Sequence, residues 1–82
     1  MNKLLVEIYV PAIGNSYDVF IPHNARVFEL LPLISEAVEK LSNGLFVPNA
    51  PVLCNGVTGV IYYSRLTVED MKLKNGSKLM LI

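Results

Sequence analysis

One long segment of this chain has the periodicity of an α-helix, and it separates two regions that alternate like β-strands. Its apolar residues recur at intervals of three and four: Val27, Leu30, Leu31, Ile34, Val38 and Leu41. This spacing predicts one main helix from about Val27 to Ser42, with a single apolar face. Asn24 is a plausible N-cap, and Asn43-Gly44 should end the helix. Pro32 falls just past the first turn, so it should bend the helix or delay its regular part.

The segments before and after the helix alternate apolar and polar residues, which is typical of half-buried strands. Strands are expected over five segments: residues 3–10, 16–21, 52–54, 60–62 and 78–82. The first two should form a hairpin through the turn Pro11–Asn15. A single helical turn, capped by Thr67, is expected at residues 67–70. The last strand has no sequence neighbour within reach of a tight turn, so we place it beside the first strand and parallel to it.

These elements predict an α+β fold of the β-grasp type, a mixed sheet of four or five strands with the helix across one face. The 82 residues are expected to form one domain, residues 1–82. Hydrophobic residues make up 52% of the chain and charged residues 17%, against about 25% charged in an ordinary domain. The core therefore needs no disulfide or metal, and apolar side chains should remain on the surface, where patches mark interaction sites.

Charge and cysteine content exclude several classes of function. Seven Lys and Arg offset seven Asp and Glu without any basic stripe, so we expect no nucleic-acid partner. No apolar run is long enough for membrane insertion, and Glu7 interrupts the only run that resembles a signal peptide. Cys54 is the single cysteine, which agrees with a reducing compartment. A cytoplasmic location is expected.

Catalytic and cofactor sites are not expected either. His23 and Cys54 are the only histidine and the only thiol, so they cannot supply the four ligands of a structural zinc site. A loop histidine and a packed core cysteine are the simpler interpretation than a catalytic pair. Glu69 and Asp70 suit the first turn of a helix. No glycine-rich phosphate loop is present. We predict no enzymatic activity, no cofactor and no small-molecule substrate.

The most specific stretch is Leu66–Leu81, which contains the capped turn at Thr67, the apolar Leu73, the turn Lys74–Ser77 and alternating apolar residues. It resembles the closing pattern of ubiquitin-like proteins, and the likeness covers essentially the whole chain. Among these families the chain is most similar to the small bacterial EsaB/YukD proteins, in its compact length and its Asn-Gly-Ser turn. That family is encoded with type VII secretion systems of Gram-positive bacteria. The resemblance therefore implies an accessory or regulatory role in such a system.

Ubiquitin and the sulfur-carrier proteins end in a flexible Gly-Gly tail whose carboxylate is activated. Here Ile82 is expected to belong to the last strand, with no glycine before it. A carrier or modifier function therefore stays open only if the coding sequence continues past Ile82.

Alternation also divides the sheet into two faces. The face toward the helix should hold Leu4, Val6, Ile8, Tyr17, Val19, Ile21, Val52, Leu79 and Leu81. The opposite face should carry a protein-binding patch: Leu5, Phe20, Leu53, Met80 and Ile82. By resemblance, Leu53 and Ile82 correspond to two positions of the recognition patch of ubiquitin. The alternative is that these are scattered surface residues. The expected function is a binding module for other proteins or, as the alternative, a homodimer that buries the same face.

Overall fold

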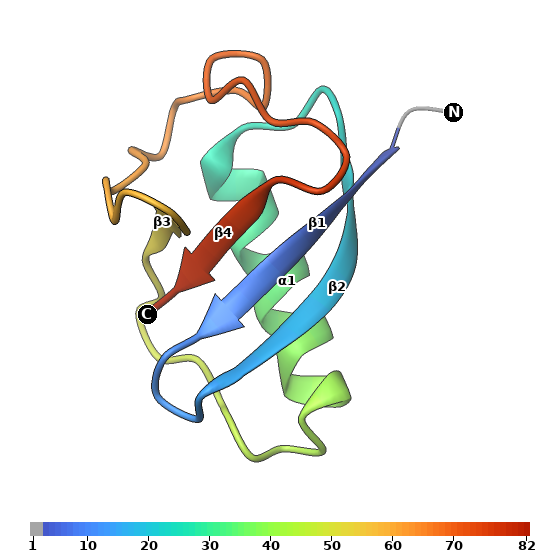
Figure 1. The fold of residues 1–82 in the computed structure, drawn as a ribbon, viewed down its shortest axis with the longest axis vertical. Coiled ribbons are helices and arrows are strands. Elements are labelled where there is room, and N and C mark those ends of the chain that lie inside the picture. The colour runs from blue at the N-terminus through green and yellow to red at the C-terminus, as the bar shows by residue number, and fades with distance from the viewer. Residues whose placement is uncertain (1–2) are drawn as a thin grey trace.

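The computed structural model describes residues 3–82, which form a four-stranded mixed sheet packed against one helix (Figure 1). The strands are β1 (Lys3–Val10), β2 (Asn15–Pro22), β3 (Leu53–Asn55) and β4 (Lys78–Leu81), and the helix is α1 (Val27–Leu41). The sheet order is β2-β1-β4-β3. β1 is antiparallel to β2 and parallel to β4, and β3 is antiparallel to β4. This arrangement confirms the predicted α+β fold and the parallel pairing of the first and last strands.

The hairpin follows its sequence signals closely. Val10 pairs with Asn15 at the closed end, and the ladder continues to the pair Lys3 and Pro22. Gly14 has a φ of 67°, which glycine adopts without a steric penalty, and its N–H donates to the carbonyl of Val10 at 2.9 Å. The predicted strand at residues 60–62 is wrong, because that segment contributes only an isolated bridge between Ile61 and Cys54.

α1 begins at Val27, as predicted, but Asn24 is not its N-cap. Arg26 holds that position, and its backbone N–H donates to Glu29 Oε1 at 2.9 Å. The helix runs without interruption through Pro32. It ends as predicted, since Asn43 and Gly44 have φ values of 54° and 77°. The Gly44 N–H donates back to the carbonyl of Glu39 at 2.8 Å, which closes the last turn.

The core lies between α1 and one face of the sheet. The helix contributes Val27, Leu30, Ile34 and Val38, and the strands contribute Val6, Ile8, Val10, Val19, Ile21, Leu53, Leu79 and Leu81. Leu4 and Tyr17 are only partly buried. Leu53, rather than the predicted Val52, is the β3 residue that faces the helix. The prediction for β3 was therefore wrong by one residue, which exchanges its two faces.

The segment before β4 closes the end of the core near the start of the helix. Thr67 and Asp70 form the predicted capped turn: the Asp70 N–H donates to Thr67 Oγ1 at 2.9 Å, and the Thr67 N–H donates to Asp70 Oδ2 at 3.0 Å. Val68 and Met71 are buried, whereas Leu73 is only partly buried. Burial of Val68 and Met71 against the core anchors this irregular segment.

Candidate protein-binding surface

The sheet face opposite α1 carries its side chains in rows that cross the strands. Pairing in the ladders places Glu7 between Asp18 of β2 and Lys78 of β4. We call these three residues the charged row. Two residues further along β1 and β4, a second row begins. Tyr9 of β1 pairs with Met80 of β4, Met80 pairs with Cys54 of β3, and Cys54 forms a bridge to Ile61. We call these four residues the apolar row. It crosses β1, β4, β3 and the segment beside β3.

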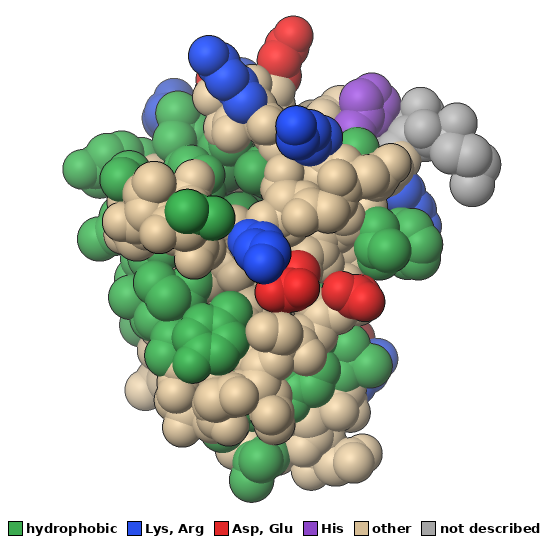
Figure 2. Space-filling view, in the orientation of Figure 1, with side chains coloured by type: hydrophobic (Ala, Val, Ile, Leu, Met, Phe, Trp, Pro, Cys, Tyr) green, Lys and Arg blue, Asp and Glu red, His purple; other side chains and the backbone are tan. Residues whose placement is uncertain are grey.

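The five residues of the predicted patch do not form one surface. Leu5 pairs with Phe20 on the other side of the charged row, away from Met80. Figure 2 shows this face with charged side chains over its centre and hydrophobic side chains on both sides of them. Leu5, Phe20 and Ile82 are exposed and Met80 is half-buried. Leu53 is completely buried and pairs with Leu81, so its assignment to the patch is wrong.

Three of the four residues of the apolar row were left out of the predicted patch: Tyr9, Cys54 and Ile61. Tyr9 is 40% exposed and Ile61 is 49% exposed. Because Tyr9 alternates with the inward residues Ile8 and Val10 of β1, its position on this face could have been included from sequence. The contribution of Ile61 could not, because it depends on a single bridge to Cys54 rather than on a strand.

Cys54 fills the middle of the apolar row. It points to the outer face as the partner of Met80, yet it is only 1% exposed. Burial raises the pKa of its thiol, because a thiolate would lose its hydration there. The side chain therefore contributes apolar contact beneath the surface, and Met80 and Ile61 continue the row on its two sides.

An ordered turn extends the hydrophobic surface past β3. Asn55 Oδ1 accepts the N–H groups of Val57 and Thr58 at 2.8 and 2.9 Å, and Asn55 Nδ2 donates to the Tyr62 hydroxyl at 3.0 Å. The exposed apolar side chains of this segment are Val57, Val60, Ile61 and Tyr63. These hydrogen bonds hold the turn in place, so its hydrophobic side chains are presented on a fixed backbone.

Ile82 lies just after β4 but keeps the pairing of the ladder. Its N–H donates to the Val52 carbonyl at 3.0 Å, and its carbonyl accepts the Val52 N–H at 2.8 Å. The side chain is 52% exposed beside the apolar row. The prediction that Ile82 lies within the strand is thus wrong by one residue, although its backbone is held as expected.

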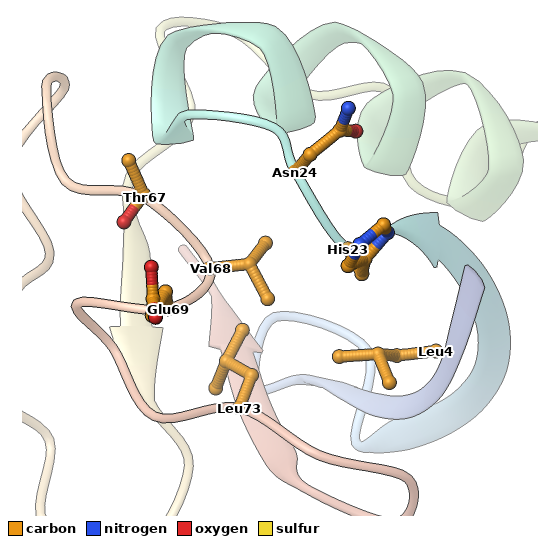
Figure 3. Close-up of a pocket in the computed structure, with 7 residues that line it drawn as sticks. All are labelled: Leu4, His23, Asn24, Thr67, Val68, Glu69 and Leu73. Carbon is orange, nitrogen blue, oxygen red and sulfur yellow. The ribbon is translucent and has the colours of Figure 1, made fainter. Parts of the chain in front are cut away.

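His23 and Cys54 lie at opposite edges of the sheet. His23 follows β2, Cys54 is in β3, and β1 and β4 lie between those strands. His23 instead lines a hollow of about 530 Å³. Figure 3 shows His23 and Leu4 across from Thr67 and Glu69, with Val68 and Leu73 between.

Within residues 3–82, no helix is long and apolar enough to cross a membrane.

Comparison with known proteins places the fold. No family model matches the sequence, and neither does any curated protein. The ubiquitin-like domain of EccD5 from Mycobacterium xenopi superposes with a TM-score of 0.82 at 17% identity, covering 100% of this chain and 94% of that one. The chain has the ubiquitin-like β-grasp fold.

Two further structures with this fold come from different kinds of protein assembly. The ubiquitin-like domain of the Mycobacterium tuberculosis type VII secretion system protein EccD1 has a TM-score of 0.77 at 11% identity, covering 100% of this chain and 99% of that one. A chain of the toluene 4-monooxygenase HD complex has a TM-score of 0.74 at 11% identity, covering 96% and 95%. At such identities the likeness concerns the fold, and function must be argued from the surface.

Proposed function

We propose that this protein is a non-catalytic ubiquitin-like binding module, of the EsaB/YukD kind, that acts as an accessory or regulatory component of a type VII secretion system in the cytoplasm of a Gram-positive bacterium. The observation that carries the proposal is the apolar row, which crosses three strands without a charged side chain. The likeness to the EccD1 and EccD5 domains supports the link to type VII secretion.

The row has the properties of a docking surface for another protein. Its members include the exposed, aromatic Tyr9 and the half-buried, flexible Met80, residue types that are enriched in the central parts of interfaces. Cys54 gives the row a buried base, and the charged row borders it on one side. An apolar centre with a polar border is the usual organisation of a protein–protein interface.

The positions of His23 and Cys54 support the non-catalytic part of the proposal. A cysteine nucleophile needs a thiolate and a nearby base. Burial instead raises the pKa of the Cys54 thiol, and two strands separate Cys54 from the single histidine.

The experiment uses two matched aspartate substitutions on the same sheet face. Met80→Asp introduces a charge into the apolar row, whereas Phe20→Asp introduces it beyond the charged row at a more exposed site. In a host that has a type VII system, deletion of the gene should reduce export of small secreted helical-hairpin proteins. Expression of the wild type or of Phe20→Asp should restore export, and Met80→Asp should not.

Both variants must first be shown to fold by circular dichroism. Full restoration of export by folded Met80→Asp would contradict the assigned surface. Unchanged export after deletion of the gene would contradict the role in type VII secretion. Loss of export with folded Phe20→Asp alone would place the surface at Leu5 and Phe20 instead.

Self-association is the second candidate, and the edge of the sheet favours it. Within residues 3–82, β2 pairs only with β1, so one side of this eight-residue strand has no strand partner. A second copy could pair there or bury the apolar row. Analytical ultracentrifugation of the wild type and Met80→Asp separates these cases. A dimer that dissociates in Met80→Asp uses the apolar row, a dimer that persists uses another surface such as β2, and a monomer contradicts self-association.

A further inference from the structure

A second hollow lies at the start of β4, between the turn after β3 and the segment before β4. Its volume is about 520 Å³, within the range of about 300–1,000 Å³ that is typical of ligand sites. We call it the lysine hollow. Its apolar side chains are Val57, Tyr62, Met71 and Leu73, and its cationic side chains are Lys72 and Lys78.

The walls of the lysine hollow are fixed by backbone contacts. Gly56 lies so close to β4 that a Cβ atom there would meet the carbonyl carbon of Lys78 at 2.8 Å. On the opposite side, the Gly76 N–H donates to the Leu5 carbonyl at 2.8 Å, and Ser77 accepts the Glu7 N–H at 2.9 Å. The backbone around the hollow is therefore held by the sheet.

Its charge is unbalanced. Lys72 and Lys78 line the hollow, and no carboxylate does. The one ion pair found within residues 3–82 joins Glu36 to Lys40 on the helix, so neither lysine has a carboxylate oxygen within 4.0 Å there. The carboxylate closest along the ladder is that of Glu7, which pairs with Lys78 in the sheet without forming an ion pair.

The acidic residues of the neighbouring turn are directed elsewhere. The Asp70 carboxylate accepts the Thr67 N–H, and Glu69 lines the hollow that contains His23. Lys74 lies between the two lining lysines in sequence and adds a third positive charge to the same segment. The segment from Lys72 to Lys78 therefore presents positive charge beside an apolar floor.

We propose that the lysine hollow binds an acidic peptide segment of the partner protein, with an apolar side chain against Met71 and Leu73 and flanking carboxylates beside Lys72 and Lys78. This inference deepens the proposed function and rests on it. Lys78 is two residues from Met80 on the same face of β4, so a partner that covers the apolar row reaches the rim of the hollow.

An acidic peptide fits better than a nucleic acid for two reasons. Nucleic-acid backbones require several cations that follow successive phosphates, whereas only two lysines line this hollow. The apolar floor also has no role toward a phosphate, but it can bury a side chain such as leucine. A carboxylate-bearing segment with an apolar residue uses both features.

The test uses a fluorescein-labelled synthetic peptide that carries one central Leu between runs of Glu. Fluorescence anisotropy should show saturable binding that weakens with salt, and a peptide with Gln in place of Glu should bind about tenfold more weakly. NMR spectra of labelled protein should show shifts centred on residues 57 and 71–78.

Matched lysine variants locate the site. Lys72 has a φ of 55°, which Asn tolerates better than most residues, so Lys72→Asn removes the charge without adding strain. The double variant Lys72→Asn with Lys78→Gln should lose about tenfold in affinity. Lys40→Gln, in the last turn of α1, removes one charge from the helix away from the hollow and should change affinity by less than about twofold.

Equal binding of the Glu and Gln peptides would overturn the inference, as would equal losses in Lys40→Gln and in the double variant. Tighter binding of an oligonucleotide that carries the same charge would also overturn it. Failure of this inference is distinguishable from failure of the proposed function. If the peptide does not bind but Met80→Asp still blocks export, only the lysine hollow is wrong. If the peptide binds but cells that express Met80→Asp export normally, only the assignment of the apolar row is wrong.

Discussion

Leu53 and Leu81 face each other across the β3–β4 ladder, and both side chains are completely buried. This pair fixes the register of β3. It turns Cys54 to the outer face opposite Met80 and leaves Val52 beside Ile82. The composition of the outer surface therefore depends on a strand of only three residues, and a shift of one residue would exchange its faces.

Replacement of Leu53 tests this register directly. Leu53→Ala should destabilise the protein by about 2–5 kcal/mol, because it removes buried methyl groups and leaves a cavity. Val52→Ala should cost less, since Val52 is only partly buried. Urea denaturation followed by circular dichroism measures both free energies of unfolding. A larger loss in Val52→Ala would restore the original assignment of Leu53 to the surface.

Leu79 and Met80 provide the same comparison within β4. Leu79 is fully buried and Met80 is half-buried on the other face. Leu79→Ala should lower the free energy of unfolding by about 2–5 kcal/mol, whereas Met80→Asp should lower it by about 1 kcal/mol or less. Thermal and urea unfolding of the two variants check this. If Met80→Asp fails to fold while Leu79→Ala is harmless, the assigned faces of β4 are reversed and the apolar row does not exist.

The parts of the fold that could be predicted from sequence have long, unambiguous periodicity. Apolar spacing gave α1 to within one residue at its end, and alternation gave the β1–β2 hairpin. The prediction of which face of β3 points inward failed because Val52, Leu53 and Cys54 are all apolar, so alternation does not distinguish the two faces there. The prediction of Asn24 as the N-cap failed because Arg26 is held by Glu29 and by contacts with residues 65–67. Residues 65–67 are distant in sequence, so a local sequence signal cannot reveal these contacts.

The candidate site was predictable one strand at a time but not as a surface. Leu5, Phe20, Met80 and Ile82 all lie on the outer face, as alternation indicated. Their separation by the charged row follows from the parallel register of Glu7 with Lys78. A long connection joins β1 to β4, and no turn signal sets that register. The lysine hollow has the same origin, because it joins segments around residues 57 and 72–78 that meet only in the folded chain.

Cys54 and His23 should be dispensable for biological function. In the folded protein, Cys54 should react slowly with iodoacetamide, because its side chain is buried and burial raises the pKa of its thiol. Labelling should become fast in urea. Cys54→Ala and His23→Ala should each support export at the wild-type level, with only modest loss of stability. Loss of export with unchanged folding and partner binding would contradict a non-catalytic role.

The capped turn at Thr67 predicts a specific response to acid. The Thr67 N–H, then the Thr67 hydroxyl and more weakly Arg26, hold the pKa of Asp70 below its ordinary value. A carboxyl whose pKa is lowered by folding stabilises the native state above its unfolded pKa of about 3.9, and this contribution disappears as the pH falls through the lower native value. The urea midpoint of the wild type should therefore fall more steeply below about pH 4 than that of Asp70→Asn, which keeps an acceptor oxygen but does not titrate. Parallel curves for the two proteins would show that the Asp70 carboxylate gains nothing from Thr67 in solution.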